Sequence, residues 1–246
     1  MIKKPRDTVD HYKNPSVATT FHEDRYGGTI GQWFMKTEQE AYANLASFIP
    51  PIGSVLDIGT GSGKLFTSIP STHFVGLDTS LPMLKTARDI GGIRSLITAN
   101  CTRLPVMTKS FDLVIGSRLL MHIPSWRHLI QECCRVAISG VILDFPIRPS
   151  FAALEPRIWS LSRRRDTHPK HRVFNRREVM ASFSEYGFEC AALSKGFVLP
   201  YRFHRSLNSL SASKLIEHVI RRTGITNLLG SPAYALFVPA DRSFRL

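Results

Sequence analysis

Short apolar runs alternate with amphipathic segments through the first 150 residues of the chain. Runs rich in Val, Ile, Leu and Phe predict five strands, at residues 54–58, 73–78, 95–98, 111–115 and 140–145. Ser80 has the position of a helix cap after the second strand, and residues 125–136 have the apolar spacing of a helix. Apolar strands separated by amphipathic helices are typical of a parallel sheet that is covered on both faces.

The two ends of the chain follow a looser pattern. Thr37 and Glu40 have capping-box spacing, which predicts a helix from about residue 37 to the prolines at 50 and 51, after a polar, turn-rich start. Later elements predicted by the same signals are a helix capped by Asn175, a strand near 189–199, a helix near 207–222 and a strand at 234–238. We therefore expect one α/β domain that continues to the end of the sequence.

Composition excludes several classes of protein. Of the 246 residues, 43% are hydrophobic, enough for a substantial core, and the length suits one large domain. No apolar run reaches the roughly 18 residues of a membrane span, and no apolar signal-peptide core follows the N-terminus. The four cysteines have neither disulfide-framework nor zinc-site spacing. We expect a cytoplasmic protein without a metal.

The formal net charge of +13 is concentrated in one segment. Residues 1–146 carry 15 basic and 12 acidic side chains, whereas residues 147–222 carry 15 basic and 6 acidic ones. Any anionic partner is therefore expected to meet residues 147–222.

The strongest chemical motif, Asp57-Ile58-Gly59-Thr60-Gly61-Ser62-Gly63, follows the first strand. Alternate glycines let a backbone turn sharply and approach a ligand, and this loop would lie at the carboxyl end of the sheet, where ligands bind. A dinucleotide fingerprint would have its third glycine one residue later. Asp78 ends the second strand, where a carboxylate can accept both hydroxyl groups of a ribose.

Together with residues 76–78, 99–105, 110–114 and 120–124, this loop resembles class I S-adenosylmethionine-dependent methyltransferases, in particular the branch similar to the ubiquinone/menaquinone methyltransferases. The resemblance covers roughly residues 10–200. It implies a Rossmann-like, mostly parallel seven-stranded sheet with helices on both faces and an antiparallel last strand. It divides the chain into an N-terminal lid, residues 1–36, and a methyltransferase domain, residues 37–246, with basic insertions near 147–174 and 200–232.

The resemblance implies S-adenosylmethionine as cofactor and assigns residues to it. Asp57 and the loop would hold the methionine part, and Asp78, with Thr79 beside it, the ribose. Asn100 stands where many relatives have an aspartate that faces the adenine amino group, and its side-chain oxygen can still accept that hydrogen bond. Cys101 would flank the base. The residues assigned to the cofactor are thus Asp57, Gly59, Thr60, Gly61, Gly63, Asp78, Thr79, Asn100, Cys101, Ser117 and Tyr26.

Ser117 and Tyr26 come from two other parts of the chain. Ser117, beyond the fourth strand, would line the cleft between cofactor and acceptor. Tyr26, in the lid, has an aromatic face that can attract the sulfonium cation, although its ring could equally pack the lid onto the core.

Methyl transfer from a sulfonium needs mainly positioning and exclusion of water. His122 is the candidate general base for an acceptor that keeps its proton, although it could instead satisfy carbonyl groups of its own turn. Candidate acceptor-binding residues are Arg118, Trp159, His171 and Arg172.

The two insertions mix basic and apolar residues. This mixture suits an anionic membrane surface or a lipid-linked substrate, and it also suits RNA or a helix packed on the sheet with its charges in water. We expect methylation of an oxygen or carbon of a small-molecule or lipid-linked, anionic acceptor, by an enzyme that is free in the cytoplasm or peripheral at the inner membrane face. The alternatives are an RNA (tRNA-type) methyltransferase and a non-catalytic, cofactor-binding scaffold of a methyltransferase complex.

Overall fold

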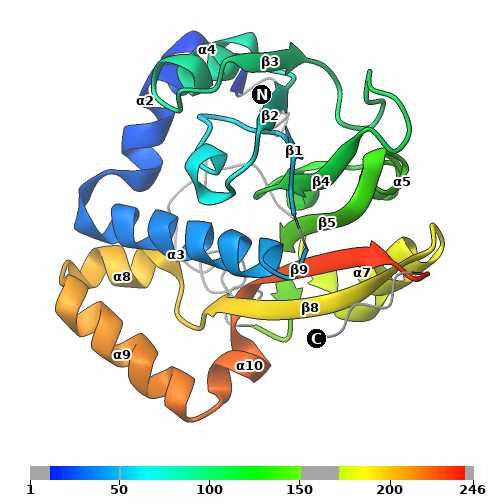
Figure 1. Ribbon diagram of the computed structural model, residues 1–246. Helices are drawn as coiled ribbons and strands as arrows, with labels where there is room; N and C mark the ends of the chain where they lie inside the picture. Colours follow the sequence, from blue (N-terminus) through cyan, green and yellow to red (C-terminus); the bar gives the residue numbers. More distant parts are fainter. Residues whose placement is uncertain (1–11, 50, 151–171, 242–246) are drawn as a thin grey trace, which may run out of the picture.

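A seven-stranded sheet forms the centre of the computed structural model, which describes residues 12–49, 51–150 and 172–241 (Figure 1). Its strand order is β3-β2-β1-β4-β5-β9-β8. The strands are β1 (Ser54–Ile58), β2 (His73–Asp78), β3 (Ser95–Thr98), β4 (Phe111–Gly116), β5 (Ala137–Phe145), β8 (Phe188–Phe197) and β9 (Ser231–Pro239). Strands β1 to β5 pair in parallel, whereas β9 runs antiparallel to both neighbours. The expected fold class is confirmed.

Helices cover both faces of the sheet. They are α2 (Pro15–Tyr26), α3 (Gly28–Ala46), α4 (Leu81–Asp89), α5 (Trp126–Val136), α7 (Arg176–Ser184), α8 (Tyr201–Leu207), α9 (Leu210–Arg222) and α10 (Ile225–Leu229). A short pair, β6 (Ile147–Arg148) and β7 (Phe174–Asn175), lies outside the main sheet. Among the described residues, no helix is both long and apolar enough to span a membrane.

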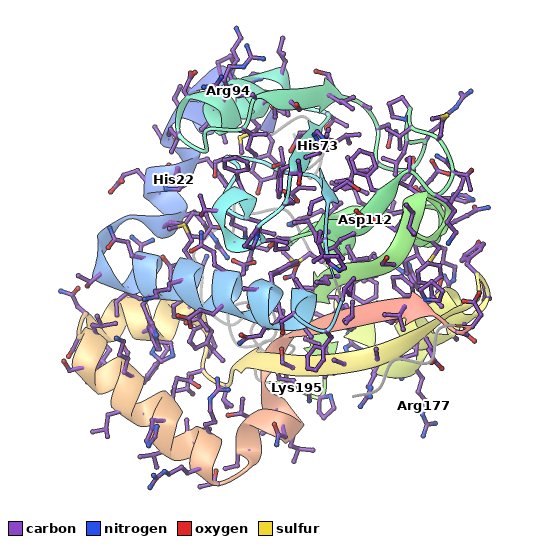
Figure 2. The ribbon with its side chains drawn as sticks, in the orientation of Figure 1. His22, His73, Arg94, Asp112, Arg177 and Lys195 are labelled. Carbon is purple, nitrogen blue, oxygen red and sulfur yellow. The ribbon has the colours of Figure 1, made fainter. Side chains whose placement is uncertain are left out.

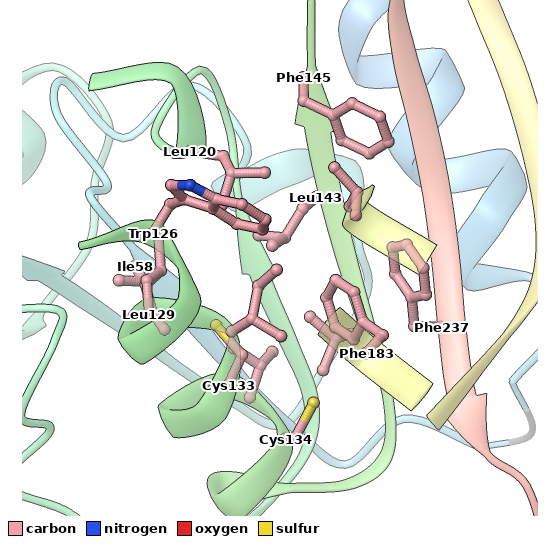
Figure 3. Packing of buried hydrophobic residues seen from close by; sticks show 14 of the residues in the cluster. Ile58, Leu120, Trp126, Leu129, Cys133, Cys134, Leu143, Phe145, Phe183 and Phe237 are labelled. Carbon is pink, nitrogen blue, oxygen red and sulfur yellow. The ribbon is translucent and has the colours of Figure 1, made fainter. Parts of the chain in front are cut away.

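Two hydrophobic clusters, one on each side of the sheet, form the core. One joins α3 and α4 to alternate residues of β4, such as Leu113 and Ile115. The other joins α5 and α7 to the opposite face and is shown in Figure 3, where the rings of Phe183 and Phe237 stack with centroids 3.5 Å apart. Cys133, on α5, is fully buried in this second cluster, as expected of a core residue.

Polar side chains fix the starts of several elements. Asp112 Oδ2 accepts hydrogen bonds from the N–H groups of Gly53 and Ser54, at 3.0 and 2.8 Å, and so ties the start of β1 to β4 (Figure 2). Ser80 caps α4 and Asn175 caps α7, both as the sequence predicts.

The predicted start of the first long helix is wrong. The N-terminal region forms α2 and α3 instead of a turn-rich segment, and Thr37 lies inside α3, where its hydroxyl donates to the carbonyl of Trp33. The glycines of this region, which suggested turns, lie at the junction of α2 and α3. A Cβ atom on Gly31 would lie 2.5 Å from the carbonyl carbon of Tyr26, so only glycine permits this approach.

Candidate active site

The loop after β1 depends on three glycines in the left-handed region, with φ of 66° at Gly59, 56° at Gly61 and 78° at Gly63. The N–H groups of Gly59 and Thr60 donate to the carbonyl of Leu77, at 2.7 and 3.0 Å, so the loop is fixed to the end of β2. A Cβ atom on Gly63 would be strained by this φ and would lie 3.0 Å from Ile93. Gly59 and Gly61 are half-buried and Gly63 is buried, and at each of the three positions a side chain would be strained by the backbone conformation.

Asp57 lies beneath this loop with one carboxylate oxygen that lacks a partner. Its side chain is buried, and Oδ2 accepts a hydrogen bond of 2.7 Å from the hydroxyl of Thr60. Oδ1 is buried and has no hydrogen-bond partner among the described residues. Burial raises the pKa of Asp57 to about 7. A buried, unsatisfied carboxylate oxygen fits a cationic group such as the ammonium of S-adenosylmethionine.

Asp78 and its neighbours form the next part of this edge. The Asp78 carboxylate accepts hydrogen bonds from the N–H groups of Gly61 and Ser80, at 3.0 and 2.9 Å, and Thr79 lies between Asp78 and Ser80 in the same turn. The oxygen of Asn100 accepts two hydrogen bonds of 2.9 Å from Thr102, so its role toward an adenine stays a prediction.

Cys101 is buried beside this turn. Burial raises the pKa of its thiol to about 11. A neutral thiol is a poor nucleophile, which argues against covalent catalysis by Cys101.

Helix α2 lies against the glycine loop, as a lid would. Its His22 Nδ1 is 3.3 Å from the hydroxyl of Ser62, and Figure 2 shows His22 on this helix. At the end of α2, the Tyr26 hydroxyl accepts a hydrogen bond of 2.9 Å from Lys64 Nζ, which also lies 5.3 Å from the centre of the Tyr26 ring. Tyr26 thus contacts a cation of the protein itself. Its predicted contact with the cofactor sulfonium remains untested.

Beyond the loop lies a set of charged side chains that we call the polar cluster: Glu38, Lys64, Arg118 and Asp144. Lys64 Nζ is 2.8 Å from Glu38 Oε2, and the hydroxyl of Ser117 donates to Glu38 Oε1 at 2.5 Å. The N–H of Arg118 donates to Asp144 Oδ1, which also accepts a bond of 3.2 Å from the Tyr42 hydroxyl. The structure therefore brings the predicted residues Ser117 and Arg118 together with three charged residues that the sequence analysis missed.

The polar cluster has unusual electrostatics. Burial raises the pKa of Asp144 to about 6. Burial also opposes ionisation of Glu38, but Lys64 and Arg118 outweigh it and hold the pKa of Glu38 below its usual value. Arg118 has φ of 54°, in the left-handed region that non-glycine residues rarely adopt. Such strain at the end of a strand is often found at functional sites.

A third cation, Arg25, enters this region from the lid. Two effects lower the pKa of Arg25: the positive charge of Arg118 is the larger one, and burial is the second. The guanidinium of Arg25 lies 5.3 Å from the centre of the Tyr201 ring, on α8. The end of α2 and helix α8 therefore meet beside the polar cluster.

The remaining predicted residues lie near the end of β4 or outside the described residues. His122 is half-buried in a short 3-10 helix (Leu120–His122) that follows β4. The N–H of Arg172 donates to the carbonyl of Met121 at 3.0 Å, so Arg172 and His122 flank the same turn. Trp159 and His171 lie outside the described residues. Among the residues that are described, no group of His, Cys, Asp or Glu side chains could hold a metal ion.

One missed residue had a signal in the sequence. Asp144 is an acid near the end of an apolar strand, as are Asp57 and Asp78. Glu38 and Lys64 had no such signal, because their contact depends on how α3 packs over the glycine loop.

This strand order, a glycine loop after β1 and an acid at the end of β2 together define the class I S-adenosylmethionine-dependent methyltransferase fold. Residues 56–144 match the family model described as a methyltransferase domain. Over residues 56–144 the chain therefore matches a methyltransferase domain, and structures of the same fold are solved with bound SAM or SAH, the cofactor of this class and its product.

Relatives with assigned functions match less than half of the chain. A tRNA (carboxymethyluridine(34)-5-O)-methyltransferase of Arabidopsis thaliana is 32% identical over 117 residues, which cover 45% of this chain and 28% of that protein. A ubiquinone biosynthesis O-methyltransferase of Hahella chejuensis is 33% identical over 99 residues, which cover 37% of this chain and 41% of that protein. The matched regions thus span less than half the length of either relative.

Solved structures extend the similarity to nearly the whole fold. Magnesium protoporphyrin IX methyltransferase of Synechocystis, solved with bound SAH, has a TM-score of 0.61 and 15% identity over 95% of this chain and 99% of that chain. A putative methyltransferase in complex with the Trm112 activator of Haloferax volcanii has a TM-score of 0.63 and 17% identity over 96% of this chain and 99% of that chain. At these identities the likeness concerns the fold.

Proposed function

We propose that the protein transfers the methyl group of S-adenosylmethionine to an oxygen or a carbon of an anionic small-molecule or lipid-linked acceptor. The observation that carries this proposal is the placement of two different sites at one edge of the sheet. Asp57, with its unpartnered oxygen, lies under the glycine loop, and the cations Lys64 and Arg118 lie directly beyond that loop. A cationic donor and an anionic acceptor would therefore be held side by side.

The residues beneath the glycine loop would bind the methyl donor. S-adenosylmethionine supplies a methyl group on a sulfonium, which is already activated for displacement. Asp57 Oδ1, buried without a partner, would accept hydrogen bonds from its ammonium group, and Asp78, held by two backbone N–H groups beside the loop, would bind the ribose. The left-handed glycines leave the backbone open to the ligand.

The region that we propose for the methyl acceptor has an excess of positive charge. Three cationic side chains, Arg25, Lys64 and Arg118, face two carboxylates, Glu38 and Asp144. Arg25 and Arg118 repel each other, which is why the pKa of Arg25 is lowered. An acceptor with a carboxylate or phosphate group would relieve this repulsion and would be held by planar guanidinium groups.

Oxygen is the favoured acceptor atom. The two relatives described above and a malonyl-[acyl-carrier protein] O-methyltransferase of Legionella pneumophila are all named for methylation of an oxygen. A hydroxyl acceptor would have to lose a proton, and both Asp144, with a pKa of about 6, and His122 are candidate bases. A carboxylate acceptor would need no base.

Methylation of RNA is the second candidate function. Two relatives, from Arabidopsis thaliana and Saccharomyces cerevisiae, are named tRNA methyltransferases, at 32% and 28% identity. The basic excess of residues 147–222 also suits a phosphate backbone.

Calorimetry with S-adenosylmethionine tests the donor side. We expect Asp57→Ala and Asp78→Ala each to weaken binding by about ten- to a hundredfold, because each removes a charge-assisted contact. Asp89→Ala is the matched control, since Asp89 is an exposed acid at the end of α4. Absence of binding by the wild-type protein, or unchanged affinity in both site variants, would overturn the proposal.

Transfer of a labelled methyl group tests the acceptor. The protein is incubated with labelled cofactor and, separately, with a lipid extract, a pool of small organic acids and total tRNA. Label in the lipid or acid fraction supports the proposal. Label in tRNA replaces it with the second candidate function, and binding of cofactor without transfer to any fraction favours a non-catalytic scaffold.

A further inference from the structure

Helices α8, α9 and α10 form a separate layer that connects β8 to β9 and lies below α3 in the view of Figure 1. The inner side of α9 is buried at Ser213 and Glu217, where the helix packs toward α3 and α8. Lys195 of β8 donates a hydrogen bond of 2.8 Å to the carbonyl of Leu228, which holds α10 against the sheet (Figure 2). This layer is therefore anchored, and its outer side is a fixed surface.

The outer side of α9 and α10, which we call the α9–α10 face, exposes four aliphatic side chains. Leu215 is 63% exposed, Val219 53%, Ile225 39% and Leu228 62%. Leu215 and Val219 are one helical turn apart and lie side by side, and Ile225 and Leu228 have the equivalent spacing on α10. Such a grouping of exposed aliphatic residues marks a site of interaction.

Basic residues surround these aliphatic side chains. Lys214, Arg221 and Arg222 are exposed on α9, and Arg202 is exposed on the adjoining α8. Arg205 of α8 is directed away from this face, because its guanidinium donates to the carbonyl of Asp24 at 3.4 Å. Residues 200–230 contain a single acidic residue, Glu217. Its side chain is buried, where it accepts hydrogen bonds from the N–H groups of Val198 and Leu199 and lies 3.2 Å from His204 Nε2. The exposed charge of the α9–α10 face is therefore of one sign.

We propose that the α9–α10 face docks on the surface of an anionic lipid membrane. The aliphatic side chains would enter the region between headgroups and acyl chains, while the basic side chains lie at the level of the phosphates. This inference goes beyond the proposed methyl transfer, because it holds whether the acceptor is lipid-linked or dissolved in water.

Two other occupants fit this face less well. RNA is bound through aromatic side chains that stack on bases. The large apolar side chains exposed on α9 and α10 are aliphatic, and Phe203 of the adjoining α8 is the single aromatic ring among the exposed large apolar side chains of this layer. A second copy of the chain, in a symmetric dimer, would bring two positively charged faces together. An anionic lipid surface satisfies both the charge and the aliphatic character of the face.

Co-sedimentation of the full chain with vesicles tests the proposal. We use vesicles of phosphatidylcholine alone and vesicles in which about a third of the lipid is phosphatidylglycerol, at low and at physiological salt. We expect binding to the anionic vesicles, at least tenfold weaker binding to the neutral ones, and a loss of affinity as salt rises. Equal binding to both compositions, or none to either, would overturn the proposal.

Matched variants locate the docking surface. Leu215→Ser with Val219→Ser, and separately Lys214→Glu with Arg221→Glu, are each expected to weaken vesicle binding at least tenfold. The controls are Ile90→Ser, an exposed aliphatic residue, and Lys85→Glu with Arg88→Glu, exposed on α4.

The variants also decide between lipid and RNA. The arginines of residues 151–171 are unchanged in every variant, so basic charge elsewhere cannot mimic the result. Controls that lose as much binding as the test pairs would refute the assignment to this face. Loss of tRNA binding with vesicle binding retained in the test pairs would assign the face to RNA.

Discussion

At the scale of single residues, Asp57 destabilises the folded protein when it is charged, although the same carboxylate is proposed to bind the cofactor. Its carboxyl group is buried, and its pKa is raised to about 7 because the charged form loses its hydration. The folded protein therefore holds a proton on Asp57 more tightly than the unfolded chain does. By linkage, the contribution of Asp57 to stability is greatest at acid pH and is lost as the pH rises from about 4 to about 7.

The variant Asp57→Asn tests whether the buried charge of Asp57 destabilises the folded protein. We expect it to be more stable than the wild-type protein at pH 8, by about 2–4 kcal/mol in the free energy of unfolding, with a smaller difference at pH 5. Denaturant unfolding at the two pH values, without cofactor, measures the effect. A wild-type protein that is the more stable one at pH 8 would mean that Asp57 Oδ1 already has a donor.

Residue types also explain which part of the site the sequence could predict. Asp57 and Asp78 were predictable because each ends an apolar strand, and parallel strands end at the same edge of a sheet. The ion pair of Glu38 and Lys64 joins a helix to a loop 26 positions away, and no periodic pattern encodes such a contact. Helix packing alone brings the polar cluster together.

At the scale of elements, strands were easier to predict than the N-terminal helices. The bounds of β1, β2 and β3 agree with the apolar runs, because buried strands are short and have polar ends. Helix α3 begins nine residues before the capping signal at Thr37. Glycine has no side chain, so a glycine needed for a close helix junction looks the same in sequence as a glycine in a turn.

Helix α8 contacts the end of α2, the proposed lid, through two hydrogen bonds, one from Tyr201 and one of 3.4 Å from Arg205 to the carbonyl of Asp24. The Tyr201 hydroxyl donates to the carbonyl of Arg25 at 2.8 Å, at the end of α2. We expect Tyr201→Phe to keep the ring beside Arg25, to loosen the lid and to weaken binding of S-adenosylhomocysteine about two- to fivefold. Calorimetry measures the affinity, with Tyr186→Phe, a half-exposed tyrosine beyond α7, as the control. Equal affinity in wild type and Tyr201→Phe would show that the lid does not depend on α8.

At the scale of the whole molecule, the reactivity of the cysteine thiols measures how tightly the core is packed. Cys101, Cys133 and Cys134 are buried, whereas Cys190 is half-buried, and none forms a disulfide. Burial raises the pKa of Cys134 to about 12, so its thiolate is scarce at neutral pH. We expect a thiol reagent to label at most one cysteine quickly in the native protein and all four in denaturant. Fast native labelling of Cys133 or Cys134 would contradict the packing of α5 against the sheet.

The charge of the whole molecule also follows the architecture. The half of the chain that carries the cofactor loop is nearly balanced, and the excess of +13 lies mainly in residues 147–222. The sequence showed this asymmetry, but only the structure shows that one basic part, α8 to α10, forms a layer apart from the glycine loop.

Strands β8 and β9 are antiparallel neighbours, and Phe197 pairs with Ser231 at the point where the chain leaves the sheet and returns to it. The two ends of the intervening segment are thus about 5 Å apart, whatever lies between them. Closing a longer or shorter loop between fixed ends changes stability only slowly with length. The length and surface of this segment can therefore change while the pairing of β8 with β9, and the glycine loop at the other end of the sheet order, stay as they are.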